Sequence, residues 1–424
     1  MNYSEFPSKE ELEKILQRPA EDVSQLEEKV LAIMRDVRER GDTAVHEYTK
    51  KFDGVEVSDL SVSESEINAA EKSVSIELKA AILLAKKNIE KFHSAQKVEV
   101  KKIETMPGVN CWRKNLPIEK VGLYIPGGSA PLFSTILMLA VPAQLAGCKE
   151  IVLCTPPSKD GTIHPAILFT AHLCGVNRIF KLGGAQAIAA MAYGTETIPR
   201  AYKIFGPGNS FVTCAKQLLS REGIAIDLPA GPSELAVYAD ATVPASFIAA
   251  DLLSQAEHGR DSQVVLISTD KNVLQKVMGE IKTQVEKLPR KEIALEALKK
   301  SQAILVKDST SAMQMLNDYA PEHLILACEN ANELSESVCN AGSVFIGAWS
   351  PESAGDYASG TNHTLPTNGY ARAWSGVSLD SFVKKVTFQE LTKEGLQNIG
   401  SALELMAEAE GLFAHKNAVT IRLK

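Results

Sequence analysis

Two side chains that can bind a metal ion, Gln255 and His258, lie three residues apart on a segment with helical periodicity. Residues at this spacing share one face of a helix, so an amide oxygen and an imidazole could supply two ligands to Zn²⁺ or a similar ion. A single histidine on a helix is more often solvated or a capping residue, so the pair alone is a weak signal. Asp356 and His363 follow in a segment rich in Gly, Ser and Asn, and could complete a mixed nitrogen and oxygen site, although spacing alone does not establish one.

A second pair, Glu322 and His323, opens a predicted strand directly after a proline. Adjacent residues of a strand point to different faces, but at an irregular strand end both side chains can reach one pocket. Histidine can act as a general base near neutral pH, and glutamate can activate water. The alternative is two unrelated polar residues. Ser233, in the rigid turn of residues 228–234, could face a ligand, or the turn could be a hinge between domains.

Two glycine-rich turns follow predicted strands, at Gly183-Gly184-Ala185-Gln186 and Gly206-Pro207-Gly208-Asn209. A strand that runs through such a turn into a helix directs backbone N–H groups and the helix dipole at a phosphate. The second turn is nearly a GxGxxG motif, but Phe211 takes the position of the third glycine. Neither turn is a complete dinucleotide fingerprint. An incomplete Rossmann-type site and two tight turns that bind nothing therefore both stay open.

The seven cysteines are scattered, odd in number and without any CxxC spacing. This usage is typical of free thiols in a reducing cytoplasm and argues against a cysteine zinc site. Cys111 and Cys148 could attack an aldehyde to form a thiohemiacetal. The sequence shows no arrangement that would lower the pKa of either thiol, so we favour their interpretation as small buried apolar residues.

Composition limits the class of protein. The 424 residues include 45 Lys and Arg and 52 Asp and Glu, which gives a net charge of −7, with 45% apolar and 23% charged residues. These values are ordinary for a folded protein and argue against a nucleic-acid surface, which usually needs a basic face. The N-terminal residues lack the apolar core of a signal peptide, and the most apolar stretch, residues 131–148, is too short to span a membrane. We therefore expect a cytoplasmic protein without nucleic-acid or membrane partners.

Alternating strands and helices are expected to position these residues. The first hundred residues have helical periodicity, with capping boxes at Ser8 and Ser24. From residue 121, short apolar runs alternate with helix-length stretches, and the alternation continues in a second unit from residue 235 to residue 346. This pattern predicts parallel sheets covered by helices on both faces.

The C-terminal part of the sequence, from residue 351, lacks this alternation of strands and helices. Residues 351–378 are rich in Gly, Ser, Thr and Asn, and we expect a long functional loop or crossing there. Residues 382–391 and 396–408 are expected to be helical, but they are too few to form an independent core. We expect this tail to pack against something else, such as another subunit.

Taken together, these segments resemble the histidinol dehydrogenase family. The resemblance runs from about residue 20 to the C-terminal helix, and a chance match to all of its motifs is negligible. The motifs occur in the family's order: Val121-Gly-Leu-Tyr-Ile-Pro-Gly-Gly, Gly183-Gly-Ala-Gln-Ala-Ile-Ala, Ile204-Phe-Gly-Pro-Gly-Asn, Pro229-Ala-Gly-Pro-Ser-Glu, Leu252-Leu-Ser-Gln-Ala-Glu-His-Gly, Ala320-Pro-Glu-His-Leu and Gly360-Thr-Asn-His-Thr-Leu-Pro-Thr.

The resemblance implies an NAD-dependent oxidoreductase that converts L-histidinol to L-histidine through the aldehyde, the last step of histidine biosynthesis. This four-electron oxidation would use two NAD⁺ and one bound Zn²⁺, which would hold the substrate's imidazole and amino nitrogens. The implied zinc ligands are Gln255, His258, Asp356 and His415. In the family the last of these comes from the partner subunit of a homodimer, which would explain a helical tail too small to fold alone.

The same resemblance implies roles for further residues. His323 would remove the alcohol proton, and Glu322 would activate water for the aldehyde step. The implied substrate contacts are Ser233, Gln255, His258, His323, Asp356, His363, Glu410 and His415, and the implied NAD contacts are Tyr124, Gln186 and Asn209.

For the fold, the resemblance implies an α/β protein with two α/β/α units on incomplete Rossmann-type parallel sheets, similar to aldehyde dehydrogenases. A helical arm of residues 1–20 would precede a first α/β domain of residues 21–117 and 234–375, which would carry the metal and acid–base residues. Residues 118–233 would form the NAD-binding α/β domain, and residues 376–424 a helical tail that reaches the partner subunit.

Three other interpretations compete with this one. A zinc hydrolase would use the same glutamate, zinc and water chemistry. A paralogue could oxidise another amino alcohol or a sulfonate analogue on the same scaffold, although His363, Glu410 and the intact zinc set favour histidinol. A non-catalytic protein with a structural zinc is disfavoured, because such sites usually recruit cysteine.

Overall fold

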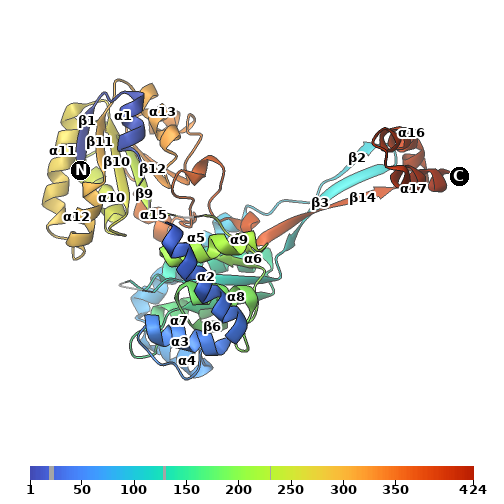
Figure 1. The fold of residues 1–424 in the computed structure, drawn as a ribbon. Coiled ribbons are helices and arrows are strands. Elements are labelled where there is room, and N and C mark those ends of the chain that lie inside the picture. The colour runs from blue at the N-terminus through green and yellow to red at the C-terminus, as the bar shows by residue number, and fades with distance from the viewer. Residues whose placement is uncertain (19–22, 128–129, 230) are drawn as a thin grey trace.

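Two parallel sheets form the body of the molecule, and a three-stranded antiparallel ribbon extends from it to the C-terminal helices (Figure 1). The structure is a computed structural model that describes residues 1–18, 23–127, 130–229 and 231–424. The expected α/β class with two parallel-sheet units is confirmed.

The five-stranded sheet has the order β6-β5-β4-β7-β8. The chain starts in the centre, runs outward through two strands and then returns to the other side of β4, so that the strand order reverses between β4 and β7. In open α/β sheets, ligands bind outside the carboxyl ends of the strands at such a point. Its elements are β4 (Lys120–Tyr124), α6 (Phe133–Ala146), β5 (Glu150–Thr155), α7 (Pro165–Leu173), β6 (Arg178–Lys181), α8 (Gly184–Tyr193), β7 (Lys203–Phe205), α9 (Ser210–Arg221) and β8 (Ala225–Ile226).

The six-stranded sheet has the order β1-β11-β10-β9-β12-β13, and all of its strand pairs are parallel. Its four inner strands, β11, β10, β9 and β12, are buried on both faces, which accounts for their nearly continuous apolar sequences. Its elements are β9 (Glu234–Ala239), α10 (Ala245–Ala256), β10 (Gln263–Ser268), α11 (Lys271–Val285), α12 (Lys291–Lys299), β11 (Gln302–Leu305), α13 (Ser309–Tyr319), β12 (His323–Ala327), α14 (Ala331–Ser335), β13 (Ser343–Ile346), α15 (Glu352–Tyr357) and the edge strand β1 (Asn2–Glu5).

The N-terminal quarter is divided differently from the prediction. Helices α2 (Val23–Arg40), α3 (Asp42–Phe52), α4 (Glu64–Ser73) and α5 (Ile76–Ser94) pack on the helices of the five-stranded sheet: α2 on α8 and α9, α4 on α7, and α5 on α6. The grouping of residues 21–117 with residues 234–375 is therefore wrong. Periodicity reveals the apolar stripe of α2 but not its partner, which is the almost wholly buried α8.

The predicted helical arm of residues 1–20 also needs correction. Strand β1 extends the six-stranded sheet, and α1 (Lys9–Ile15) packs against the same sheet through Leu12 and Ile15. The capping box at Ser8 is confirmed. Helix α2 is described from Val23 onward, and the side chain of Ser24 lies outside the described part of the chain, so the capping box expected there stays a prediction. Residues 19–20 of the arm lie outside the described residues.

The C-terminal segment is only partly the predicted helical tail. Residues expected to be helical form β14 (Val383–Leu391), which pairs along its whole length with β3 (Val109–Pro117), and β3 also pairs with β2 (Lys102–Met106). This pairing with a distant strand overrides the local helical pattern. Helices α16 (Lys393–Ala409) and α17 (Phe413–Leu423) follow as predicted, while the expected loop before β14 contains α15 and the short helices η1 (Tyr370–Arg372) and η2 (Leu379–Phe382). Within the described ranges, the chain has no helix that is long and apolar enough to cross a membrane.

Candidate active site

The predicted acid–base pair lies at the amino end of β12, next to the start of β9. His323 is the first residue of β12 and lies opposite Leu235 of β9. The turn before it contains Ala320 in a left-handed conformation (φ 52°), so Glu322 precedes the regular strand and is free of its alternation. Both side chains are buried, and His323 Nδ1 lies 3.7 Å from Glu322 Oε2.

The protein backbone fixes the protonation of His323. Its Nδ1 lies 3.2 Å from the carbonyl oxygen of Glu234, which can only accept a hydrogen bond, so the proton of the neutral ring is on Nδ1. Nε2 is then a free base, and it has no hydrogen-bond partner among the described residues. Burial lowers the pKa of His323 to about 3, which keeps the ring neutral near neutral pH and leaves Nε2 unprotonated.

Glu234, whose carbonyl oxygen contacts His323, also holds the side chain of Glu322 through its backbone N–H. One carboxylate oxygen, Oε2, accepts a hydrogen bond from the Glu234 N–H at 2.9 Å. Burial raises the pKa of Glu322 well above its usual range, against the opposing effect of that hydrogen bond. A carboxylate with a raised pKa is a stronger base toward water than an exposed one.

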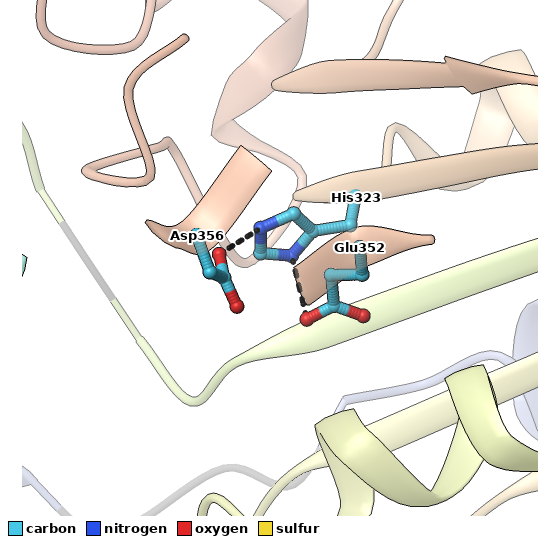
Figure 2. Close-up of side chains that lie close together, drawn as sticks. All are labelled: His323, Glu352 and Asp356. Atoms are coloured by element: carbon cyan, nitrogen blue, oxygen red, sulfur yellow. Dashed lines mark ion pairs between the residues drawn. The ribbon is translucent and has the colours of Figure 1, made fainter. Parts of the chain in front are cut away.

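Two carboxyls of α15 flank the imidazole (Figure 2). His323 Nε2 lies 3.7 Å from Asp356 Oδ1, and Nδ1 lies 3.7 Å from Glu352 Oε1. One nitrogen or oxygen of each of the three residues lies within 4.8 Å of the others. Sequence reasoning found Asp356 but missed Glu352, which is fully buried. The signal that could have found it is the spacing of four residues on a short helix beginning after Pro351.

Gln255 and His258 lie at the end of α10, with Gln255 Nε2 3.3 Å from His258 Nδ1. Burial is the main cause of the lowered pKa of His323, and the His258 imidazole is close enough to lower that pKa further. Gln255 is fully buried. Of the predicted zinc ligands, Asp356 thus lies directly beside the predicted base, and Gln255 and His258 lie together at the end of α10.

His363 connects the two units of the body. Its Nδ1 donates to the carbonyl oxygen of Asp356 at 2.9 Å, and its Nε2 lies 3.2 Å from the hydroxyl of Thr135 on α6. Burial lowers the pKa of His363 to about 4, so the ring is neutral and Nε2 can accept from that hydroxyl. These contacts hold the backbone of Asp356 against the five-stranded sheet.

Two predicted residues are not brought to this site within one chain. Glu410 follows α16 and His415 lies in α17, and both side chains are exposed. Figure 1 shows these helices at the far end of the ribbon, away from both parallel sheets.

The three predicted NAD contacts line one cavity of about 690 Å³ outside the carboxyl ends of the five-stranded sheet. The Tyr124 hydroxyl accepts a hydrogen bond from the Gly184 N–H at 3.1 Å, and Asn209 caps α9. Both amide atoms of Gln186 are buried and lack a hydrogen-bond partner in the parts of the chain that the structure describes. Asn209 also lines a second cavity of about 620 Å³ with Ser233 and His258, so this residue borders both cavities.

Sequence reasoning missed one charged residue of the first cavity. Asp53, at the end of α3, lines it beside Tyr124. Burial raises the pKa of Asp53 to about 6. The predicted domain of residues 21–117 and 234–375 includes α3, so the sequence does not place the Asp53 carboxyl near the glycine turns.

Of the two cysteines considered as nucleophiles, Cys148 lies in surroundings that disfavour its thiolate form. Burial raises the pKa of Cys148 to about 11, so its thiol stays protonated near neutral pH. Cys111 lies on β3 of the ribbon. The interpretation of Cys148 as a small apolar core residue agrees with its position in the buried cluster of the five-stranded sheet.

The donor set around His323 fits a divalent cation. The buried oxygen Oε1 of Gln255 has no hydrogen-bond partner among the described residues, and such an atom calls for an ion or water. Burial raises the pKa values of Glu352 and Asp356, the latter to about 7, and a nearby cation would favour their charged forms. Amide oxygen, imidazole and carboxylate are ligands that suit zinc.

Comparisons with known proteins agree with the fold. The family model described as histidinol dehydrogenase matches residues 16–423. The chain is 61% identical over 423 residues to a histidinol dehydrogenase of Bacteroides thetaiotaomicron, with 100% of this chain and 99% of the relative covered. It is 52% identical over 417 residues to that of Escherichia coli, with coverages of 98% and 95%. A crystal structure of histidinol dehydrogenase from Elizabethkingia anophelis superposes with a TM-score of 0.98 at 57% identity, covering 100% of this chain and 98% of that one.

Proposed function

The chain belongs to the histidinol dehydrogenase family, a family of oxidoreductases, and from this premise we propose its reaction and the residues that perform it. The proposed reaction is the oxidation of L-histidinol to L-histidine through histidinal, the last step of histidine biosynthesis. Each of the two oxidations removes two electrons, and water supplies the second carboxylate oxygen. NAD⁺, when bound, would supply the hydride acceptor for each oxidation.

The observation that carries this proposal is the free Nε2 of His323. It is a buried, neutral base that the Glu234 carbonyl holds in one tautomer, and it lies 3.7 Å from a carboxylate oxygen of Asp356. In the first oxidation His323 accepts the alcohol proton at Nε2 while the hydride leaves the carbinol carbon. Glu322 then takes a proton from water as the water adds to the aldehyde, and His323 returns the alcohol proton to the aldehyde oxygen. His323 is then free to accept a proton from the resulting hydrate during the second oxidation.

Gln255, His258 and Asp356 would hold Zn²⁺, with His415 as a fourth ligand. When bound, the ion would supply a fixed positive centre that orients the nitrogen atoms of the substrate. Ser233 and His258 line the second cavity, in which histidinol would bind, and His363 keeps Asp356 in place. This orientation matters because hydride transfer needs a short approach between the carbinol carbon and its acceptor.

The cofactor assignment is supported by Gln186. Its amide is buried with both polar atoms unsatisfied among the described residues, in the cavity that Tyr124 and Asn209 also line. A ligand with hydroxyl and phosphate oxygens would satisfy such groups, and its nicotinamide end could reach the second cavity past Asn209. The site lies where the strand order of the five-stranded sheet reverses.

A homodimer is the proposed assembly. The tail and the ribbon expose large apolar side chains, among them Ile103, Leu405, Met406 and Phe413. Exposed apolar surface of this kind usually marks an interaction site. A second copy of the chain could cover it and present Glu410 and His415 to the body of the first copy.

An NADH absorbance assay tests the proposed function. We expect histidinol and NAD⁺ to give two NADH for each histidinol consumed, with histidine as the product. A zinc hydrolase would give no NADH, and a paralogue for another amino alcohol or a sulfonate analogue would leave histidinol unreacted. Either result would overturn the proposal.

Metal removal gives a second prediction. Chelation is expected to lower turnover by about 100-fold or more while the protein stays folded, and added Zn²⁺ is expected to restore it. Because the three ligands lie on folded elements, Zn²⁺ should also raise the unfolding temperature of the metal-free protein. The Gln255→Ala variant, which lacks the buried amide oxygen, should show a smaller shift. Full activity in protein shown to be free of metal would contradict the zinc assignment.

A further inference from the structure

We propose that Arg18 and Glu234 are positioning residues for this oxidation, because their ion pair fixes the backbone that holds both Glu322 and His323. The inference rests on the acid–base roles proposed above for those two residues. It concerns how Glu322 and His323 are held in place, since neither Arg18 nor Glu234 needs to contact the reacting atoms.

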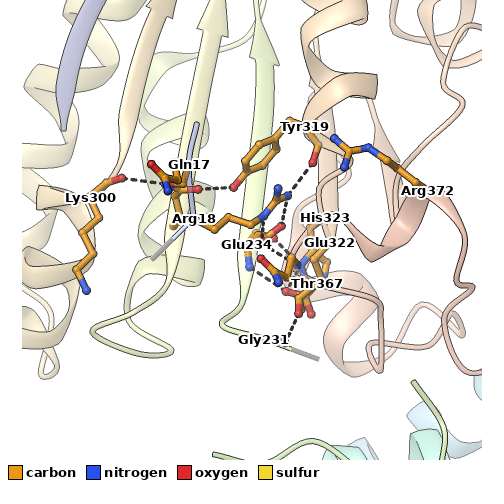
Figure 3. Close-up of polar contacts among 12 residues, drawn as sticks. Gln17, Arg18, Gly231, Glu234, Lys300, Tyr319, Glu322, His323, Thr367 and Arg372 are labelled. Carbon is orange, nitrogen blue, oxygen red and sulfur yellow. Dashed lines mark hydrogen bonds and ion pairs between the residues drawn. The ribbon is translucent and has the colours of Figure 1, made fainter. Parts of the chain in front are cut away.

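The main chain of Glu234 contacts both members of the acid–base pair (Figure 3). Its N–H donates to Glu322 Oε2 at 2.9 Å, and its carbonyl oxygen lies 3.2 Å from His323 Nδ1. The first contact orients the carboxylate, and the second selects the tautomer whose Nε2 is free. A shift of this one residue would therefore misplace both catalytic groups together.

The side chain of Glu234 is held by Arg18 from the N-terminal segment. Arg18 donates from Nε to Oε1 at 2.5 Å and from a terminal nitrogen to Oε2 at 2.9 Å, a two-point geometry that fixes orientation as well as distance. The N–H of Asn368 adds a third hydrogen bond, to Oε1 at 2.8 Å. The side chain is only 2% exposed, so these partners decide where it lies.

Arg18 also contacts the segment that leads to the other catalytic strand. Its guanidinium donates to the carbonyl oxygen of Tyr319 at 2.7 Å and lies over the Tyr319 ring, 4.1 Å from its centroid. The Tyr319 hydroxyl in turn donates to Gln263 at 2.7 Å. Since Tyr319 precedes the turn into Glu322, Arg18 connects the starts of β9 and β12.

Loss of Arg18 would leave the Glu234 carboxyl buried without its cationic partner. A buried carboxylate that loses its partner becomes protonated or moves toward water, and burial already favours a raised pKa at Glu234. Either response disturbs the backbone between the two catalytic contacts. Misplacement of about 1 Å in an active site can cost about 100-fold in rate.

The test compares Arg18→Met and Arg18→Lys with the matched control Arg372→Met. Arg372 is a nearby exposed arginine that donates to the Asp318 carbonyl. We expect Arg18→Met to lower kcat for both histidinol and histidinal by about 10- to 100-fold, with KM for histidinol and NAD⁺ changed by less than about threefold. Arg18→Lys should recover only part of kcat, because an ammonium group lacks the two-point geometry, and Arg372→Met should match the wild type.

A double-mutant cycle separates positioning from general loss of stability. If the ion pair acts as a unit, Arg18→Met combined with Glu234→Gln should lower kcat no further than the more severe single variant. Additive losses in kcat would overturn the inference, as would unchanged kcat in Arg18→Met. A rise in either KM that exceeds the fall in kcat would instead mean that Arg18 binds a ligand directly, and would also overturn it.

The proposed function and this inference can fail separately. If His323→Asn and Glu322→Gln keep their activity, the acid–base assignment is wrong. If those two variants lose activity as proposed while Arg18→Met does not, the assignment stands and only the positioning role of Arg18 is wrong.

Discussion

Replacing His323 by asparagine is expected to lower kcat for histidinol and for histidinal alike, by about 100- to 10,000-fold, the usual range for a lost general base. The asparagine amide keeps a donor near the position of Nδ1, so the hydrogen bond to the Glu234 carbonyl can persist. It lacks the second ring nitrogen, which is the proposed base in both oxidations. The loss should therefore be similar whichever substrate is supplied.

The measurement is the steady-state rate of NADH formation with each substrate in turn. His172→Asn is the matched control, because His172 is an exposed histidine of α7 that should leave both rates unchanged. A His323→Asn variant that keeps more than a tenth of the wild-type rate on both substrates would exclude His323 as the base. A loss confined to histidinol would assign it to the first oxidation only.

Glu322→Gln provides the contrast that separates the two catalytic residues. The glutamine can still accept from the Glu234 N–H, but it cannot take a proton from water. We expect histidinal oxidation to fall by about 100-fold or more, with a smaller effect on the first oxidation. In a single turnover with excess enzyme, NADH per histidinol should drop from two toward one. Normal turnover of histidinal would show that Glu322 does not activate the water.

The sequence predicts much of the fold because the strands of the two parallel sheets have a distinct local sequence pattern. Strands such as β4 and β9 are buried on both faces, so they appear as short apolar runs between helix-length segments. The strands of the antiparallel ribbon have no such pattern. Strand β14 is mostly exposed and is paired only to β3, more than 250 residues away in sequence, so its local pattern could not distinguish strand from helix.

The site was predictable to a different extent for different residues. Glu322, His323, Gln255 and His258 are close in sequence to helix or strand ends, where a polar residue among apolar neighbours is conspicuous. The roles of Arg18 and Glu234 depend on a contact across 216 residues, which no local pattern encodes. The choice of tautomer at His323 likewise depends on a backbone carbonyl of another strand. Sequence therefore indicated the reacting groups, while only the fold indicates what orients them.

Heterodimers with the two lesions on different chains are expected to regain about half of the wild-type activity per dimer. The lesions are His415→Asn and Gln255→Asn, and either variant alone should be nearly inactive because each of its two sites lacks one zinc ligand. His415 lies on α17 at the far end of the ribbon (Figure 1), while Gln255 is buried in the body. If tails are exchanged, the heterodimer has one site made of an intact body and an intact tail.

The reciprocal arrangement makes this test decisive. A heterodimer of wild-type chain with a chain that carries both lesions has the same number of mutations, but exchanged tails would then place one lesion in each site. We expect that dimer to be nearly inactive. Sites built within one chain require the opposite pattern, with about half activity when both lesions share a chain and none when they are separated. Purification through two different affinity tags verifies the dimers. Which of the two dimers is the more active does not depend on how strongly either lesion weakens zinc binding.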